Sequence, residues 1–113
     1  MKNGIYAVDI KMLDGVKASA TGVMLLKDGK ILAADSYFWS VGSYTFKDGK
    51  WKGDMVTNQF APTKAAKPLF GGREVSTGFS GTYANDEAEV YASSLVGKVS
   101  ISFRARVKYL GDW

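Results

Sequence analysis

Apolar and polar residues alternate strictly along the final stretch of the chain, Val99–Tyr109. The apolar set comprises Val99, Ile101, Phe103, Ala105, Val107 and Tyr109. The positions between them carry serine, arginine and lysine. A period of two over this length predicts a β-strand with one buried and one solvated face, because a helix would place apolar residues three and four apart.

Shorter alternating runs, separated by turn signals, fill most of the remaining sequence. They predict strands over residues 4–12, 17–26, 30–35, 37–46, 51–60, 74–83, 88–94 and 99–109. The turn signals between them are Asp14-Gly15, Asp28-Gly29, Asp48-Gly49, Asn85-Asp86 and Gly97-Lys98. Residues 1–113 therefore form one all-β domain, in which eight antiparallel strands in an up-and-down meander can close into a barrel without exposed edges. A two-sheet sandwich is the alternative that this pattern leaves open.

The rhythm of strands breaks between residues 61 and 73. Pro62 and Pro68 cannot donate a hydrogen bond to a sheet ladder, so they disfavour a central strand. The residues between the two prolines can form a single helical turn, which predicts a short helical turn near residues 62–68. This longest connection is the expected lid or crossover of the fold.

Composition supports the all-β prediction and limits the setting of the protein. The 113 residues include 13 glycines and 13% aromatic residues, which suit tight turns and strands. No apolar run is long enough for a membrane-spanning helix. The start lacks the apolar block of a signal peptide and cysteine is absent, so a cytoplasmic location is expected.

The formal net charge is +4, and the densest basic group is the alternating set Arg104, Arg106 and Lys108. Such a stripe suits a phosphate, nucleic acid or acidic partner, or it forms a solubilising outer face. Base stacking requires aromatic and basic side chains on one exposed surface. Here they fall on opposite faces of the strand, so nucleic acid is not an expected partner.

The chain lacks the usual equipment of an enzyme. Histidine and cysteine are absent, which removes the commonest general base, the commonest metal ligands and thiol nucleophiles. No phosphate-binding loop, dinucleotide fingerprint or nucleophile elbow is present, and most carboxylates fall in turns. We therefore expect no catalytic residues, no metal and no cofactor.

The strands predicted over 17–26 and 37–46 are apolar on both faces, so one of those faces would meet water in a monomeric barrel. The expected homodimer interface on these strands comprises Val23, Leu25, Tyr37, Trp39 and Val41. The alternative is that the connection 61–73 covers them from within the same chain.

The inward faces of the strands could instead enclose a small apolar ligand. The candidate cavity residues are Tyr6, Val8, Tyr44, Phe79, Tyr83, Ile101 and Phe103. Ordinary packing of a hydrophobic core is the alternative interpretation of the same residues.

Several short motifs, in order, resemble the GrlR-like family, named for a negative regulator of type III secretion. They are Lys2-x-Gly4-x-Tyr6, Gly22-Val23, Asp28-Gly29-Lys30-Ile31, Asp35-Ser36-Tyr37, Val41-Gly42-Ser43-Tyr44, Phe70-Gly71, Phe79-Ser80-Gly81 and Phe103-Arg104-Ala105. This resemblance covers most of the chain and implies a lipocalin-like, eight-stranded barrel that forms a homodimer and acts without catalysis.

In the secretion regulator, repression works by binding a transcriptional activator, and an acidic loop is tied to that contact. The resemblance places the corresponding partner loop at Lys47, Asp48, Gly49 and Lys50, which is not acidic here. The expected function is accordingly regulation through a protein partner such as a transcriptional regulator. The alternative is a carrier that holds an apolar ligand inside the barrel.

Overall fold

The structure, a computed structural model, describes residues 2–12, 19–61, 74–96 and 99–113. It contains eight strands: β1 (Gly4–Met12), β2 (Ser19–Lys27), β3 (Lys30–Ala34), β4 (Phe38–Lys47), β5 (Lys50–Gln59), β6 (Val75–Ala84), β7 (Glu87–Val96) and β8 (Val99–Gly111). The predicted strands are all present, with ends shifted by a few residues at most. The helical turn predicted near residues 62–68 lies outside the described residues.

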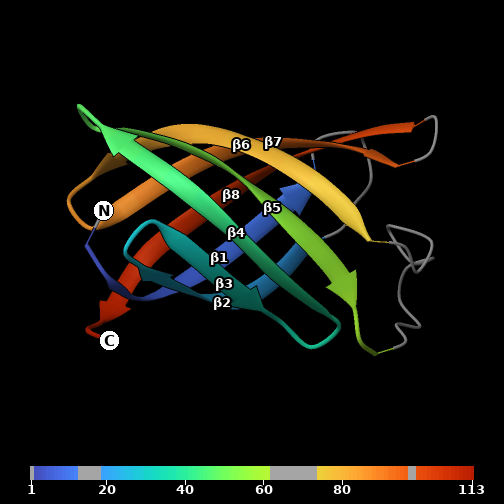
Figure 1. Ribbon diagram of the computed structural model, residues 1–113, viewed down its shortest axis with the longest axis horizontal. Helices are drawn as coiled ribbons and strands as arrows, with labels where there is room; N and C mark the ends of the chain where they lie inside the picture. Colours follow the sequence, from blue (N-terminus) through green and yellow to red (C-terminus); the bar gives the residue numbers. More distant parts are fainter. Residues whose placement is uncertain (1, 13–18, 62–73, 97–98) are drawn as a thin grey trace.

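The strands form a closed barrel in which each pairs antiparallel with the next (Figure 1). The barrel closes where β1 pairs with β8, which brings Val8 opposite Val107 and Tyr6 opposite Tyr109. This pairing excludes the two-sheet sandwich and confirms the predicted eight-stranded, up-and-down, antiparallel barrel. Both ends of the chain lie at one end of it (Figure 1).

Three tight hairpins join strands at the end of the barrel where the chain begins and ends. Their central residues have positive φ angles, and these are Asp28 and Gly29, Asp48 and Gly49, and Asn85 and Asp86. Positive φ at both central positions is the property of type I′ turns, which match the twist of antiparallel strands. The predicted turns at 14–15 and 97–98 lie outside the described residues.

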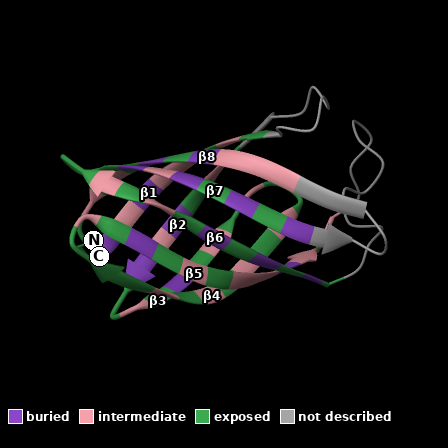
Figure 2. Ribbon diagram, turned by 90° about the horizontal axis from the view of Figure 1, so that it is seen from above, coloured by how far each residue is buried: buried purple, intermediate pink, exposed green. Residues whose placement is uncertain are grey.

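Side chains alternate between the interior of the barrel and its outer surface, as Figure 2 shows by the banding along several strands. The buried hydrophobic cluster comprises Tyr6, Met24, Leu26, Ile31, Trp51, Phe79, Ala88, Val90, Ala92, Ala105 and Val107. Within it, the rings of Trp51 and Phe79 meet edge to face, with 4.8 Å between their centroids. The interior is therefore filled with interlocking side chains near the hairpin end.

Further from the hairpins the interior becomes more polar. The hydroxyls of Ser40 and Thr57, on β4 and β5, lie 2.7 Å apart, and those of Thr77 and Ser94, on β6 and β7, also form a hydrogen bond. Both pairs join residues that face each other across neighbouring strands. Each hydroxyl therefore satisfies its partner, which is the condition for placing such groups inside a barrel.

Candidate binding surfaces

A cluster of tyrosines fills the hairpin end of the barrel. The rings of Tyr6 and Tyr109 meet edge to face, with 5.4 Å between their centroids. The Tyr6 hydroxyl donates to the carbonyl of Lys2, 2.6 Å away. The Lys2 ammonium lies 3.8 Å from the centroid of the Tyr109 ring and 3.4 Å from a carboxylate oxygen of Asp86. These contacts fasten the start of the chain to β8 and to the β6–β7 hairpin.

The same cluster holds its phenols in the neutral form. Burial raises the pKa of Tyr6 and of Tyr44, and burial together with a hydrogen bond to Asp86 raises the pKa of Tyr83. The hydrogen bond that Tyr109 donates to Asp112 raises its pKa to about 12. Ionising the hydroxyl of Tyr6, Tyr83 or Tyr109 would remove a donor that the folded chain uses, so these three act as structural groups.

The predicted cavity residues gather inside the barrel. Tyr6 and Phe79 are buried, and the half-buried members Val8, Tyr44, Tyr83 and Phe103 pack against the same core. The side chain of Ile101 lies outside the described residues. Six of the seven candidates therefore share one interior, and a ligand among them remains a prediction.

The predicted interface residues of β2 and β4 point outward. Val23, Trp39 and Val41 are 47%, 39% and 40% exposed, and Leu25 beside them is half-buried. Tyr37 is exposed too, although it belongs to the loop before β4, where its amide donates to the carboxylate of Asp35. The strands thus present four of the five predicted residues on one continuous outer surface.

Sequence reasoning missed Leu32, which is 46% exposed on β3. Leu32 lies opposite Leu25 on one side and Val41 on the other, while Val23 and Trp39 both face Ala34. The five residues of β3 are too few for alternation to show which of them point outward. We call Val23, Leu25, Leu32, Trp39 and Val41 the apolar outer face.

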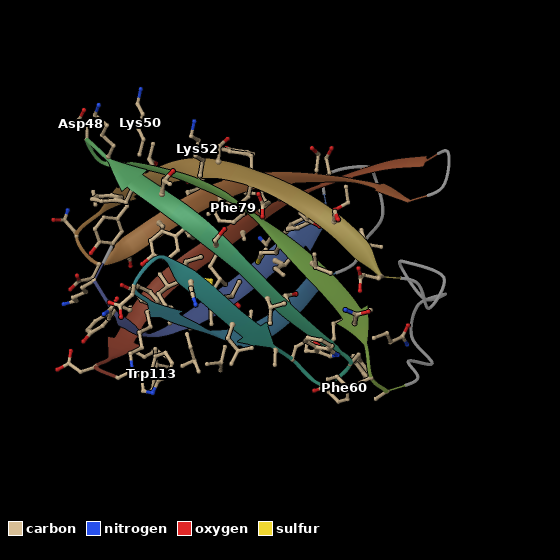
Figure 3. The ribbon with its side chains drawn as sticks, in the orientation of Figure 1. Asp48, Lys50, Lys52, Phe60, Phe79 and Trp113 are labelled. Atoms are coloured by element: carbon tan, nitrogen blue, oxygen red, sulfur yellow. The ribbon has the colours of Figure 1, made fainter. Side chains whose placement is uncertain are left out.

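The predicted partner loop forms the tip of the β4–β5 hairpin. Lys47, Asp48 and Lys50 are exposed, and Asp48 and Lys50 project from that end of the barrel (Figure 3). The carbonyl of Gly49 accepts a hydrogen bond from the backbone amide of Tyr83, 2.9 Å away. The tip is therefore tied to β6 and carries two positive charges against one negative charge.

Acidic neighbours offset the basic stripe of β8. The Arg104 Nε lies 3.4 Å from a carboxylate oxygen of Glu89, and Arg106 stands between Glu89 of β7 and Asp9 of β1. Lys108 lies opposite Glu87. This alternation of sign favours a solubilising surface over a phosphate or nucleic-acid contact.

In comparisons with known proteins, the chain matches no protein-family model and no curated protein. Across the described residues, no three acidic, histidine or cysteine side chains gather to hold a metal ion. The same part of the chain has no helix that is long and apolar enough to cross a membrane. Fold and surface define a closed antiparallel barrel that carries an apolar outer face on β2, β3 and β4.

Proposed function

We propose that this protein is a non-enzymatic regulator that works by binding other proteins, and that it pairs with a second copy through the apolar outer face. The observation that carries the proposal is the row Leu25, Leu32 and Val41, in which facing strands set aliphatic side chains side by side on the outer wall. Contiguous apolar patches on an outer surface mark interaction sites. The resemblance to the GrlR-like family supports the same role.

The composition of the face suits association driven by burial. None of its five members is charged, and charged residues are depleted at the centres of protein interfaces. Trp39 is exposed on this surface, and tryptophan is among the residues that dominate binding energy when an interface desolvates them. A two-fold pairing would place each row against its own equivalent in the partner.

Analytical ultracentrifugation across a range of protein concentrations tests the pairing. We expect the wild-type chain to sediment as a dimer and the variants Leu32→Lys and Val41→Lys to sediment as monomers with unchanged circular dichroism. The matched control is Thr82→Lys, which adds the same charge at an exposed outer position of β6 and leaves the dimer intact. A wild-type chain that stays monomeric at high concentration contradicts the pairing.

The regulatory partner would meet the exposed tip of the β4–β5 hairpin, in the cytoplasm. Because Lys47 and Lys50 outnumber Asp48 there, a complementary partner surface carries acidic groups. Capture of host proteins on the immobilised wild-type chain, compared with a Lys47→Glu/Lys50→Glu variant, tests this role. Recovery of a transcriptional regulator by the wild-type chain alone supports this regulatory role. Equal recovery by both forms excludes the β4–β5 hairpin tip as the surface that binds the partner.

A second candidate function is the carriage of a small apolar ligand inside the barrel. One observation favours it: the indole Nε1 of Trp51 is buried and has no hydrogen-bond partner among the residues that the structure describes. Buried polar groups are nearly always paired, so this donor could serve a ligand acceptor. Native mass spectrometry of the protein purified from its host would detect a bound molecule. A single mass equal to the bare chain contradicts the carrier function.

A further inference from the structure

An open hollow with a volume of about 910 Å³ is lined by exposed residues of the outer wall of the barrel and is bordered also by the interior residues Tyr44, Phe79 and Phe103. Strands β4 to β8 form it, and β4 also carries Trp39 and Val41 of the apolar outer face, but the two surfaces have no residue in common. Serine and threonine hydroxyls line much of this wall, together with Lys52, Asp54 and Tyr91. No proposed role of the protein uses these residues.

The centre of the hollow is a grid of two rows of facing residues. One row runs Lys52, Ser80 and Tyr91, and the other runs Asp54, Gly78 and Ser93, across β5, β6 and β7. Small residues therefore occupy the middle strand, whereas Lys52, Asp54 and Tyr91 stand on the strands at either side and Ser93 is small as well. This arrangement makes a shallow trough along β6.

Gly78 has no packing reason to be glycine. A Cβ built at this position meets no atom within 4 Å, whereas a Cβ at Gly81 on the same strand would lie 1.9 Å from a backbone oxygen of Glu89. A glycine in the middle of a strand costs stability, and it often marks a site where a ligand approaches the backbone. The absence of a side chain at position 78 is therefore, after the hollow itself, a second observation that points to a bound ligand.

The two charged residues beside the floor balance each other. Within the described part of the chain, neither the Lys52 nor the Asp54 side chain forms a hydrogen bond or an ion pair. They stand two positions apart on the outer side of β5, and Lys52 extends into solvent (Figure 3). Together with the hydroxyls they offer both donors and acceptors but no net charge, which suits a neutral polar ligand.

Tyr91 supplies an exposed aromatic ring whose position is fixed. The side chain is 53% exposed, yet its hydroxyl donates to a carboxylate oxygen of Glu89, 3.1 Å away. Arg104 in turn holds that carboxylate. A ring held in this way loses little conformational freedom when the apolar face of a ligand packs on it.

We propose that this hollow binds a short, uncharged oligosaccharide. A sugar combines many hydroxyls, which match the donors and acceptors around Gly78, with C–H faces that pack on the ring of Tyr91. A closed barrel has no free strand edge here, so an extended peptide could not dock by main-chain pairing. Asp54 disfavours an anionic ligand. The lining of this site shares no residue with the apolar outer face.

Amide chemical shifts of the full ¹⁵N-labelled chain, titrated separately with maltotriose, chitotriose and inorganic phosphate, test the proposal. We expect at least one sugar to shift amides of β5, β6 and β7 around Gly78, and phosphate to shift none of them. Tyr91→Ala should weaken binding by about tenfold through the loss of the ring contact. Gly78→Leu should block binding, because its side chain fills the trough.

The control is Thr82→Ala, on the same strand but outside the hollow, which should bind as the wild type does. Circular dichroism of each variant confirms that the barrel is intact, and Asp54→Asn gives a second, sterically conservative loss of affinity. The proposal is overturned if neither sugar shifts these amides, if phosphate alone does so, or if Gly78→Leu binds sugar with unchanged affinity.

Discussion

The ring of Phe79 packs against Gly53, its facing residue across β5 and β6. A Cβ at position 53 would lie 2.9 Å from Cζ of that ring and 2.1 Å from the backbone oxygen of Ser43. The absent side chain thus lets an aromatic ring cover the strand from inside while β4 approaches from the other side. Glycine covered by a cross-strand aromatic ring is one way in which strongly curved sheets close into barrels.

Gly53→Ala should therefore lower the free energy of unfolding by about 1–3 kcal/mol, because the new methyl group displaces either the ring or the backbone of β4. Urea denaturation followed by circular dichroism measures the loss. Gly78→Ala is the matched control, since its Cβ meets no atom within 4 Å. That change should be neutral or stabilise by up to about 1 kcal/mol. Equal losses in the two variants would contradict this account of Gly53.

The buried hydroxyls of Thr77 and Ser94 should behave as a coupled pair. Thr77→Val leaves the Ser94 hydroxyl without its partner and should cost about 1–3 kcal/mol of unfolding free energy. Adding Ser94→Ala should then cost less than it does alone, because no orphaned hydroxyl remains. Urea denaturation of the full double-mutant cycle measures the coupling, and Thr82→Val on the outer wall serves as control. Strict additivity would show that the hydrogen bond contributes nothing.

The tyrosine cluster should make the protein sensitive to alkali. The folded-state pKa of Tyr6, Tyr44, Tyr83 and Tyr109 is raised above 10.0, the ordinary value. Above pH 10 the unfolded chain loses these protons first, so the stabilisation is complete below pH 10 and falls as the pH rises through the folded values.

Urea midpoints measured between neutral pH and about pH 12, together with absorbance of the phenolate, check this expectation. Tyr109→Phe removes one titrating group and should make the decline above pH 10 shallower. A midpoint that stays constant throughout the alkaline range would show that these hydroxyls ionise equally in both states.

Truncation of two neighbouring residues of β3 should change the free energy of unfolding by very different amounts. Ile31 is 3% exposed and faces the interior, so Ile31→Ala should cost about 2–5 kcal/mol of unfolding free energy. Leu32 points outward, and Leu32→Ala should change the stability of a monomer by less than about 0.5 kcal/mol. If the chain pairs through the apolar outer face, the loss at Leu32 should grow with protein concentration in thermal denaturation. A large loss that is independent of concentration would place Leu32 in the core.

Much of the architecture follows from local patterns in the sequence. The alternation over Val99–Tyr109 identifies β8. The two Asp-Gly pairs identify the β2–β3 and β4–β5 hairpins of the barrel, because only a few residue types accept positive φ. Closure of the barrel does not follow in the same way. The pairing of Tyr6 with Tyr109 joins the two ends of the chain, and a one-faced strand serves a sandwich equally well.

The surfaces were predicted only in part. Val23, Trp39 and Val41 were found because their strands are apolar at every second position on both sides. Leu32 was missed since its strand is too short, and Tyr37 falls in a loop rather than on a strand. The hollow around Gly78 depends on how the strands curve, which residue types alone do not encode.

Pairing of the first strand with the last has a consequence for synthesis in the cell. While the polypeptide emerges from the ribosome, β1 lacks one neighbour until β8 has been translated. The unfinished wall meanwhile presents a seam of unsatisfied amides and carbonyls, to which another nascent strand can attach. Escape from aggregation therefore depends on how quickly β8 is translated and pairs with β1.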